Sequence, residues 1–139
     1  MEKLMLDNNE ALTEQHLESL LYNSNEWKSE VEMWKQELKF FQKLLDKYAS
    51  KMTTVEQKQK MDHFQNLIIY YDGELLDFFK QKARRHAKYL AEHVENNRPL
   101  DKNEYHEKFG AVNAQLNAFG SEFRKYKKEF FQFMENALE

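Results

Sequence analysis

The sequence predicts an all-α fold, an antiparallel up-down-up bundle of three long helices with coiled-coil-like packing. The 139 residues include one proline and three glycines, so the chain has few places to turn. Apolar residues recur at alternating steps of three and four, the spacing of one helix face. Polar clusters near residues 50 and 100 divide this pattern into three segments of similar length. We therefore expect one domain over residues 1–139, with helices at about 9–49, 54–95 and 102–137.

The first helix is predicted to begin near Asp7 and Glu10, which have the spacing of a capping box. A seam of ten positions follows without a slip of phase, and nine of the ten are apolar. The seam consists of Leu17, Leu20, Ser24, Trp27, Val31, Trp34, Leu38, Phe41, Leu45 and Tyr48. This regularity indicates one helix through the polar segment 23–25.

The second helix contains the most apolar stretch of the chain, Met61–Ala83, and we expect it to be central. Its start is predicted at the capping box of Thr53–Glu56. The stripe from Tyr71 through Leu75 and Phe79 advances by steps of four, which is a stutter. Gly73 follows Asp72 in a dipeptide typical of turns, and a turn here would give four helices of unequal length. The matched lengths of three helices favour an unbroken second helix.

The third helix is predicted to follow the break at Glu95–Leu100, with Asp101 and Glu104 as its capping box. All ten positions of its seam are apolar. They are Tyr105, Phe109, Val112, Leu116, Phe119, Phe123, Tyr126, Phe130, Phe133 and Ala137. Gly110 and Gly120 lie beside the seam, where we expect them to permit close approach of a neighbouring helix.

Composition and motifs argue against several function classes. A glycine-rich phosphate loop, a Gly-x-Ser-x-Gly elbow and a His-Glu-x-x-His zinc motif are all missing from the sequence. No histidine follows a glutamate by three residues, as a carboxylate-bridged di-iron bundle requires. The net charge of −3 disfavours nucleic acid as a partner, and no apolar segment approaches the ~20 residues of a membrane span. We expect a cytoplasmic protein that is not an enzyme and binds neither nucleic acid nor membranes.

The one candidate site consists of histidines near one end of the predicted bundle. Counting back from the turns places His16 near the level of His86, and His93 near that of His106. Imidazole and nearby carboxylates are suitable ligands for zinc or another transition metal. Two alternatives are a pH-responsive cluster and partly buried, hydrogen-bonded histidines that close the core. We expect no cofactor, with a transition metal such as zinc as the alternative.

The preferred functional prediction is a non-catalytic interaction or scaffold protein that self-associates. Five consecutive apolar residues run from Leu67 to Tyr71 and point in all directions around the helix. Part of this run has to remain exposed in a monomer, so Leu67, Ile69 and Tyr70 are predicted to form an interface. The partner would be a second copy, forming a homodimer, or another protein. The alternative function is a metal-binding helical protein that uses the histidine-rich end.

Overall fold

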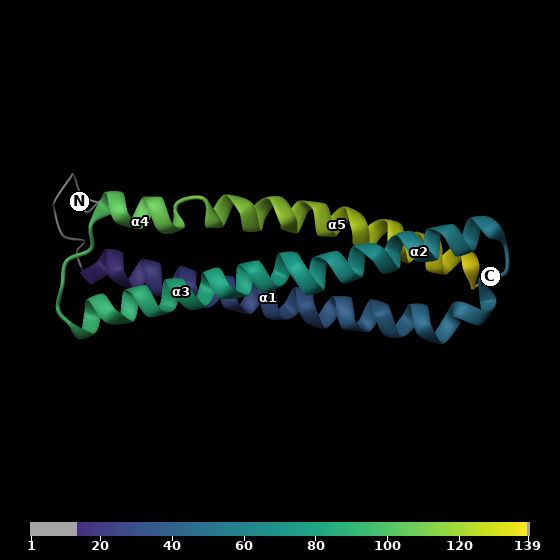
Figure 1. Ribbon diagram of the computed structural model, residues 1–139, viewed down its shortest axis with the longest axis horizontal. Helices are drawn as coiled ribbons and strands as arrows, with labels where there is room; N and C mark the ends of the chain where they lie inside the picture. Colours follow the sequence, from purple (N-terminus) through teal and green to yellow (C-terminus); the bar gives the residue numbers. More distant parts are fainter. Residues whose placement is uncertain (1–13, 139) are drawn as a thin grey trace. The chain divides into compact units, whose positions relative to one another are not determined.

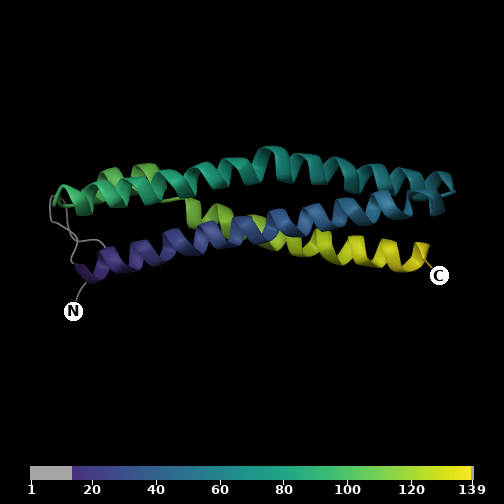
Figure 2. The ribbon, with the colours of Figure 1, turned by 90° about the horizontal axis from the view of Figure 1, so that it is seen from below.

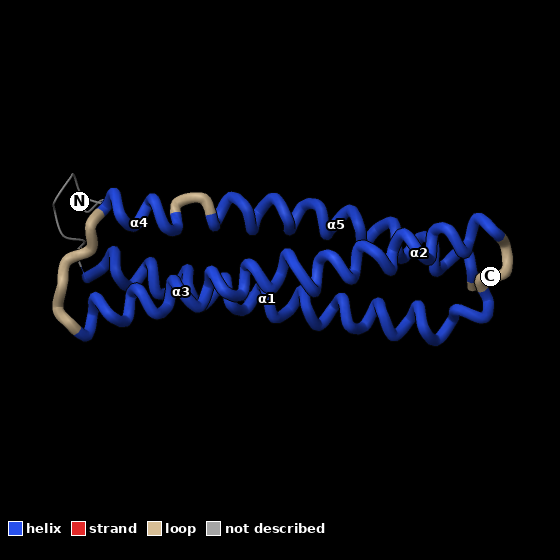
Figure 3. Tube along the Cα trace, in the orientation of Figure 1, coloured by secondary structure: helices blue, strands red, loops and turns tan. Residues whose placement is uncertain are grey.

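The computed structural model describes residues 14–138, which are helical apart from short connections (Figures 1 and 3). Among these residues there is no strand. The elements are α1 (Glu14–Tyr48), a 3-10 turn η1 (Ala49–Lys51), α2 (Val55–Tyr70), a π-helical turn η2 (Tyr71–Leu75), α3 (Leu76–Glu95), α4 (Lys102–Phe109) and α5 (Val112–Ala137). α2, η2 and α3 follow one another without a break (Figure 2). The predicted fold class of three long packed helices is confirmed; the predicted cap at Asp7 lies outside the described residues.

The helices contribute to two compact units. The first unit contains residues 14–31 and 79–116, and the second contains residues 32–78 and 117–138. Each unit contains a part of α1, a part of the second long helix and a part of the third. The single domain expected over the whole chain stays a prediction.

Contacts within the second unit define the directions of its helices. Gln42 and Gln65 exchange side-chain hydrogen bonds of 2.8 and 2.6 Å, while Lys35, earlier in α1, bonds Asp72, later in the second helix. α1 and α2 are therefore antiparallel. Phe41 on α1 lies 6.2 Å from Phe123 and 4.7 Å from Phe130, between ring centroids, so aromatic side chains of α5 fill the core.

The π-helical turn corrects the predicted stripe. Leu75 was expected in the core, but it is only partly buried, and Leu76 is fully buried instead. The buried stripe thus steps five residues from Tyr71 to Leu76, where the Leu76 N–H donates to the Tyr71 carbonyl. A π turn inserts one extra residue and restores the spacing of three and four beyond it. Gly73 lies inside this turn without a positive φ, so the second helix is continuous, as predicted.

The third long helix contains a short turn that the prediction did not include. α4 ends at Phe109 and α5 begins at Val112, with Gly110 and Ala111 in a turn. A Cβ on Gly110 would lie 2.5 Å from the carbonyl oxygen of His106, so the conformation of this turn excludes larger residues. A Cβ on Gly120 would make an ordinary contact of 3.5 Å with the Trp34 ring, so the predicted role of Gly120 in close approach stays a prediction.

The helix ends are capped by local hydrogen bonds. The capping box of α2 lies one residue later than predicted, with Thr54 as N-cap and Gln57 as its partner. Asp101 caps α4 as expected by accepting from two backbone N–H groups. After α3, Asn97 has a φ of 52°, and the N–H groups of Asn97 and Arg98 donate to the carbonyls of Val94 and His93. This is a Schellman motif with asparagine at its left-handed position.

None of the described helices is both long enough and apolar enough to cross a membrane.

Candidate functional site

His86 is the centre of the candidate site, which lies within the first unit. Its side chain is completely buried. The imidazole lies 4.3 Å from the Trp27 ring of α1 and 4.9 Å from the Phe109 ring of α4, between centroids. Its Nε2 is 2.7 Å from the hydroxyl oxygen of Tyr105. A histidine of the core stripe is therefore enclosed by aromatic rings and has one polar partner.

These surroundings favour the neutral imidazole. Burial lowers the pKa of His86 to about 4, because a charged ring would lose its hydration. Burial also raises the pKa of Tyr105 to about 12, so the phenol keeps its proton at neutral pH. The Nδ1 atom of His86 is buried and makes no hydrogen bond within the described part of the chain. The site thus holds a neutral histidine–tyrosine pair.

The other predicted histidines have different environments. His93 is buried, and its Nδ1 lies 2.8 Å from the Tyr89 carbonyl, which can only accept, so this nitrogen is the donor. His16 is also buried, whereas His106 is exposed. Three of the four histidines are core residues in the described structure.

The predicted levels of the histidines along the helices were wrong. His86 lies beside Trp27, which follows His16 by eleven residues in α1. On the third helix, Tyr105 contacts His86 and not His93. The count assumed a turn near residue 51, but the hydrogen bonds between Gln42 and Gln65 place its midpoint between residues 53 and 54, which accounts for part of the offset. The π turn then adds a further residue to the second helix. Trp27 and Tyr105 were assigned to apolar seams, and their ability to contact a buried histidine was missed.

The geometry gives the metal hypothesis no support. Over residues 14–138, no three or more histidine, aspartate or glutamate side chains form a group that could hold a metal ion. The Nε2 of His86 is already engaged by Tyr105. Metal binding by His16, His86, His93 and His106 therefore stays a hypothesis from the sequence.

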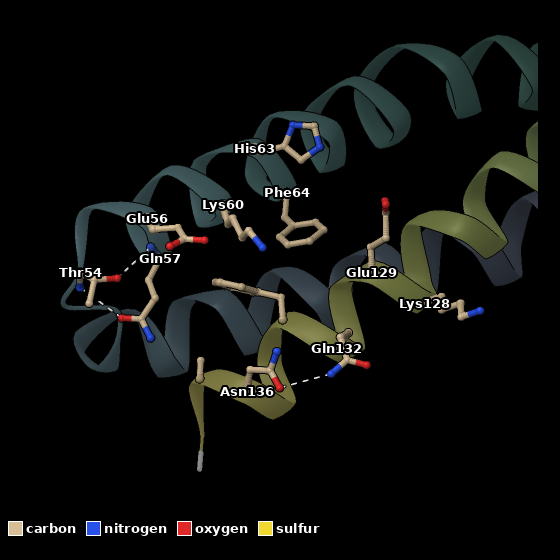
Figure 4. A pocket seen from close by; sticks show the side chains of 12 residues that line it. Thr54, Glu56, Gln57, Lys60, His63, Phe64, Lys128, Glu129, Gln132 and Asn136 are labelled. Carbon is tan, nitrogen blue, oxygen red and sulfur yellow. Dashed lines mark hydrogen bonds between the residues drawn. The ribbon is translucent and has the colours of Figure 1, made fainter.

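A pocket of 660 Å³ lies between α2 and α5 in the second unit (Figure 4). Phe64 and Phe133 supply its apolar surface, with their rings 5.3 Å apart between centroids. Side chains of both charges and several amides form its rim, and in Figure 4 Lys128 points away from the gap. The pairing of Thr54 with Gln57 in the capping box occupies polar groups at one end. The lining thus combines two phenylalanines with His63 and with acidic, basic and amide side chains.

The predicted interface residues are partly exposed. Ile69 is 60% exposed and Tyr70 46% exposed, whereas Leu67 is half-buried. Their neighbours Ile68 and Tyr71 are buried in the core of the second unit. The apolar run therefore divides between core and surface, as its length suggested.

Lys35 forms a polar site at the π-helical turn. Its ammonium nitrogen lies 3.0 Å from the Asp72 carbonyl oxygen and 2.9 Å from a carboxylate oxygen of both Asp72 and Asp77. Partial burial opposes the charge of Lys35, but the hydrogen bonds to Asp77 and Asp72 outweigh it and raise the pKa. A cation from α1 thus binds the irregular turn of the second helix.

Comparison with known proteins identifies no relative: no protein-family model, curated protein or solved structure matches the chain.

Proposed function

We propose that this chain is a non-catalytic interaction protein whose helical bundle self-associates. The observation that carries the proposal is the exposure of large hydrophobic side chains on all three helices of the second unit. They include Met33 and Phe40 of α1, Ile69 and Tyr70 of the second long helix, and Phe131 of α5. Burial of such side chains against a partner removes apolar surface from water. This stabilises the complex by about 25 cal/mol for each Å² of apolar surface that is buried.

The interior of each unit supports the same proposal. The core is filled by aromatic rings and aliphatic side chains, and the buried His86 Nε2 and Tyr105 hydroxyl form a hydrogen bond with one another. A site that does chemistry needs a polar constellation open to a substrate. The pocket between α2 and α5 is lined by charged and amide side chains around Phe64 and Phe133, and the hydrogen bonds among them join Thr54 with Gln57 and Gln132 with Asn136. The exposed apolar side chains are the features that a partner would contact.

Gel filtration coupled to light scattering tests self-association directly. We expect the purified full chain to elute with about twice the mass of one copy and to shift toward the monomer on dilution, since a dimer dissociates by mass action. A chain that remains monomeric at high micromolar concentration would contradict the proposed function.

A further inference from the structure

One face of α1 carries a second stripe with the spacing of a coiled-coil seam. Eight positions advance by alternating steps of four and three, and all eight are exposed. They are Tyr22, Glu26, Ser29, Met33, Gln36, Phe40, Lys43 and Lys47. The average step of 3.5 residues keeps such a stripe along one side of a helix that packs against another helix. The buried seam of α1 is already occupied by its own bundle, so the second stripe is available to a partner.

The middle of this stripe is apolar. Met33 is 55% exposed and Phe40 54% exposed, and they lie two helical turns apart on α1. Phe40 also packs beside Phe41, which contacts the exposed Phe131 of α5. The second unit thus presents an apolar patch next to the α1 stripe.

The charges on the exposed side of α1 select the orientation of a second copy. The exposed charges before the apolar centre are Glu26, Lys28, Glu30 and Glu32, and those after it are Lys39, Lys43, Asp46 and Lys47, so the first part is net acidic and the second net basic. In a parallel pair of α1 helices, like charges would face each other at both ends. In an antiparallel pair, the acidic part of each helix would face the basic part of the other. Because α1 is one unbroken helix, this pattern follows from its sequence and helical rise alone.

We infer that the partner in the proposed self-association is a second copy of this chain, bound through antiparallel contact of the two α1 helices. The two-fold axis passes near Gln36. Met33 of each copy packs beside Phe40 of the other, and Glu26 faces the turn from Lys43 to Lys47. This contact is isologous, so it closes as a dimer. The inference rests on the proposed function, and it assigns the contact to α1 rather than to Leu67, Ile69 and Tyr70.

Engineered cysteines test this geometry without interference, because the chain contains no cysteine. Gln36→Cys should form a disulfide between copies on mild oxidation, since the residue lies near the axis. Lys47→Cys alone should not, because its two copies would be about 33 Å apart along the paired helices. A mixture of the Glu26→Cys and Lys47→Cys variants should form the mixed disulfide.

Each other result of the crosslinking has a defined meaning. Efficient disulfide formation by Lys47→Cys with itself would show a parallel pair and overturn the inference. A dimeric mass without crosslinking at any of these positions would assign the contact to another surface, such as Ile69 and Tyr70. That result would overturn the inference and leave the proposed function in place. A monomeric mass would contradict both.

Charge reversal provides a second test with a built-in rescue. Lys43→Glu with Lys47→Glu places acid against acid in both halves of the symmetric contact, and it should raise the dimer dissociation constant about tenfold or more. Adding Glu26→Lys and Glu32→Lys should restore dimerisation. Lys125→Glu with Lys128→Glu on α5 is the matched control and should leave the constant unchanged. Equal weakening by both lysine pairs, or no rescue, would overturn the inference; circular dichroism melting confirms that each variant is folded.

Discussion

His86 is a single buried residue through which we expect acid to destabilise the bundle. Its ring is completely buried among Trp27, Tyr105 and Phe109. Burial alone accounts for the lowered pKa, and Tyr105 supplies a neutral partner. A protonated His86 would need hydration that the folded state denies, whereas the unfolded chain provides it.

The first prediction is a loss of stability in mild acid. The folded pKa of His86, about 4, lies below the unfolded value of ~6.5. Its contribution is therefore fully present above pH 6.5 and is lost as the pH falls toward 4. The free energy of unfolding should decrease over this range by an amount on the order of 3 kcal/mol. Urea unfolding measured between pH 7.5 and 4.5 reports it.

Two variants test whether His86 causes the loss of stability in acid. His86→Leu should flatten the dependence on pH, whatever it does to stability at neutral pH. His106→Gln changes an exposed histidine and should leave the dependence unchanged. An unaltered pH dependence in His86→Leu would show that other groups cause the response.

Glycine substitutions give the second prediction. Gly73→Ala should stabilise the fold by about 0.4–1 kcal/mol, because φ is not positive and nothing lies within 4 Å of the added Cβ. Gly110→Ala should destabilise it, because the Cβ would meet the His106 carbonyl oxygen at 2.5 Å. Thermal or urea unfolding of the two variants compares them directly. Destabilisation by Gly73→Ala would contradict the negative φ of Gly73 and the open space around its Cβ position.

At the scale of the elements, the second long helix depends on an irregular turn. The π turn at Tyr71–Leu75 shifts the buried stripe by one residue, so that both α2 and α3 direct apolar faces into their units. Lys35 of α1 binds the Asp72 carbonyl and two carboxylates at this turn. A cross-helix cation thus stabilises the place where regular α-helical hydrogen bonding changes.

The third prediction concerns this cation. Lys35→Met keeps much of the side-chain length but removes the hydrogen bonds to Asp72 and Asp77, and it should lower the free energy of unfolding by about 1 kcal/mol. Lys39→Met removes an exposed lysine of the same helix and should change it by less than about 0.5 kcal/mol. Equal effects of the two substitutions in urea unfolding would show that Lys35 does not stabilise the π turn.

At the scale of the molecule, periodicity predicted the helices because burial of an apolar stripe is a local property of the sequence. The register in which the helices pack, in contrast, depends on contacts between residues far apart in the sequence. The change from Leu75 to Leu76 in the core depends on a π turn held by α1, and the break at Gly110 is a backbone feature that an apolar seam does not reveal. The candidate site was misplaced for the same reason. His86 was named as a candidate site residue, but its contacts with Trp27 and Tyr105 depend on the register of the helices.

Native mass spectrometry of the full chain tests the proposed self-association most directly, because it reports the number of copies in each particle. The same measurement detects any bound metal. A bundle that self-associates through an exposed helical face should give a dimer as the principal species. The mass should equal that of two polypeptides, also after exposure to zinc and buffer exchange. A monomer at every concentration, or one zinc ion retained per chain and lost in His86→Leu, would contradict the account.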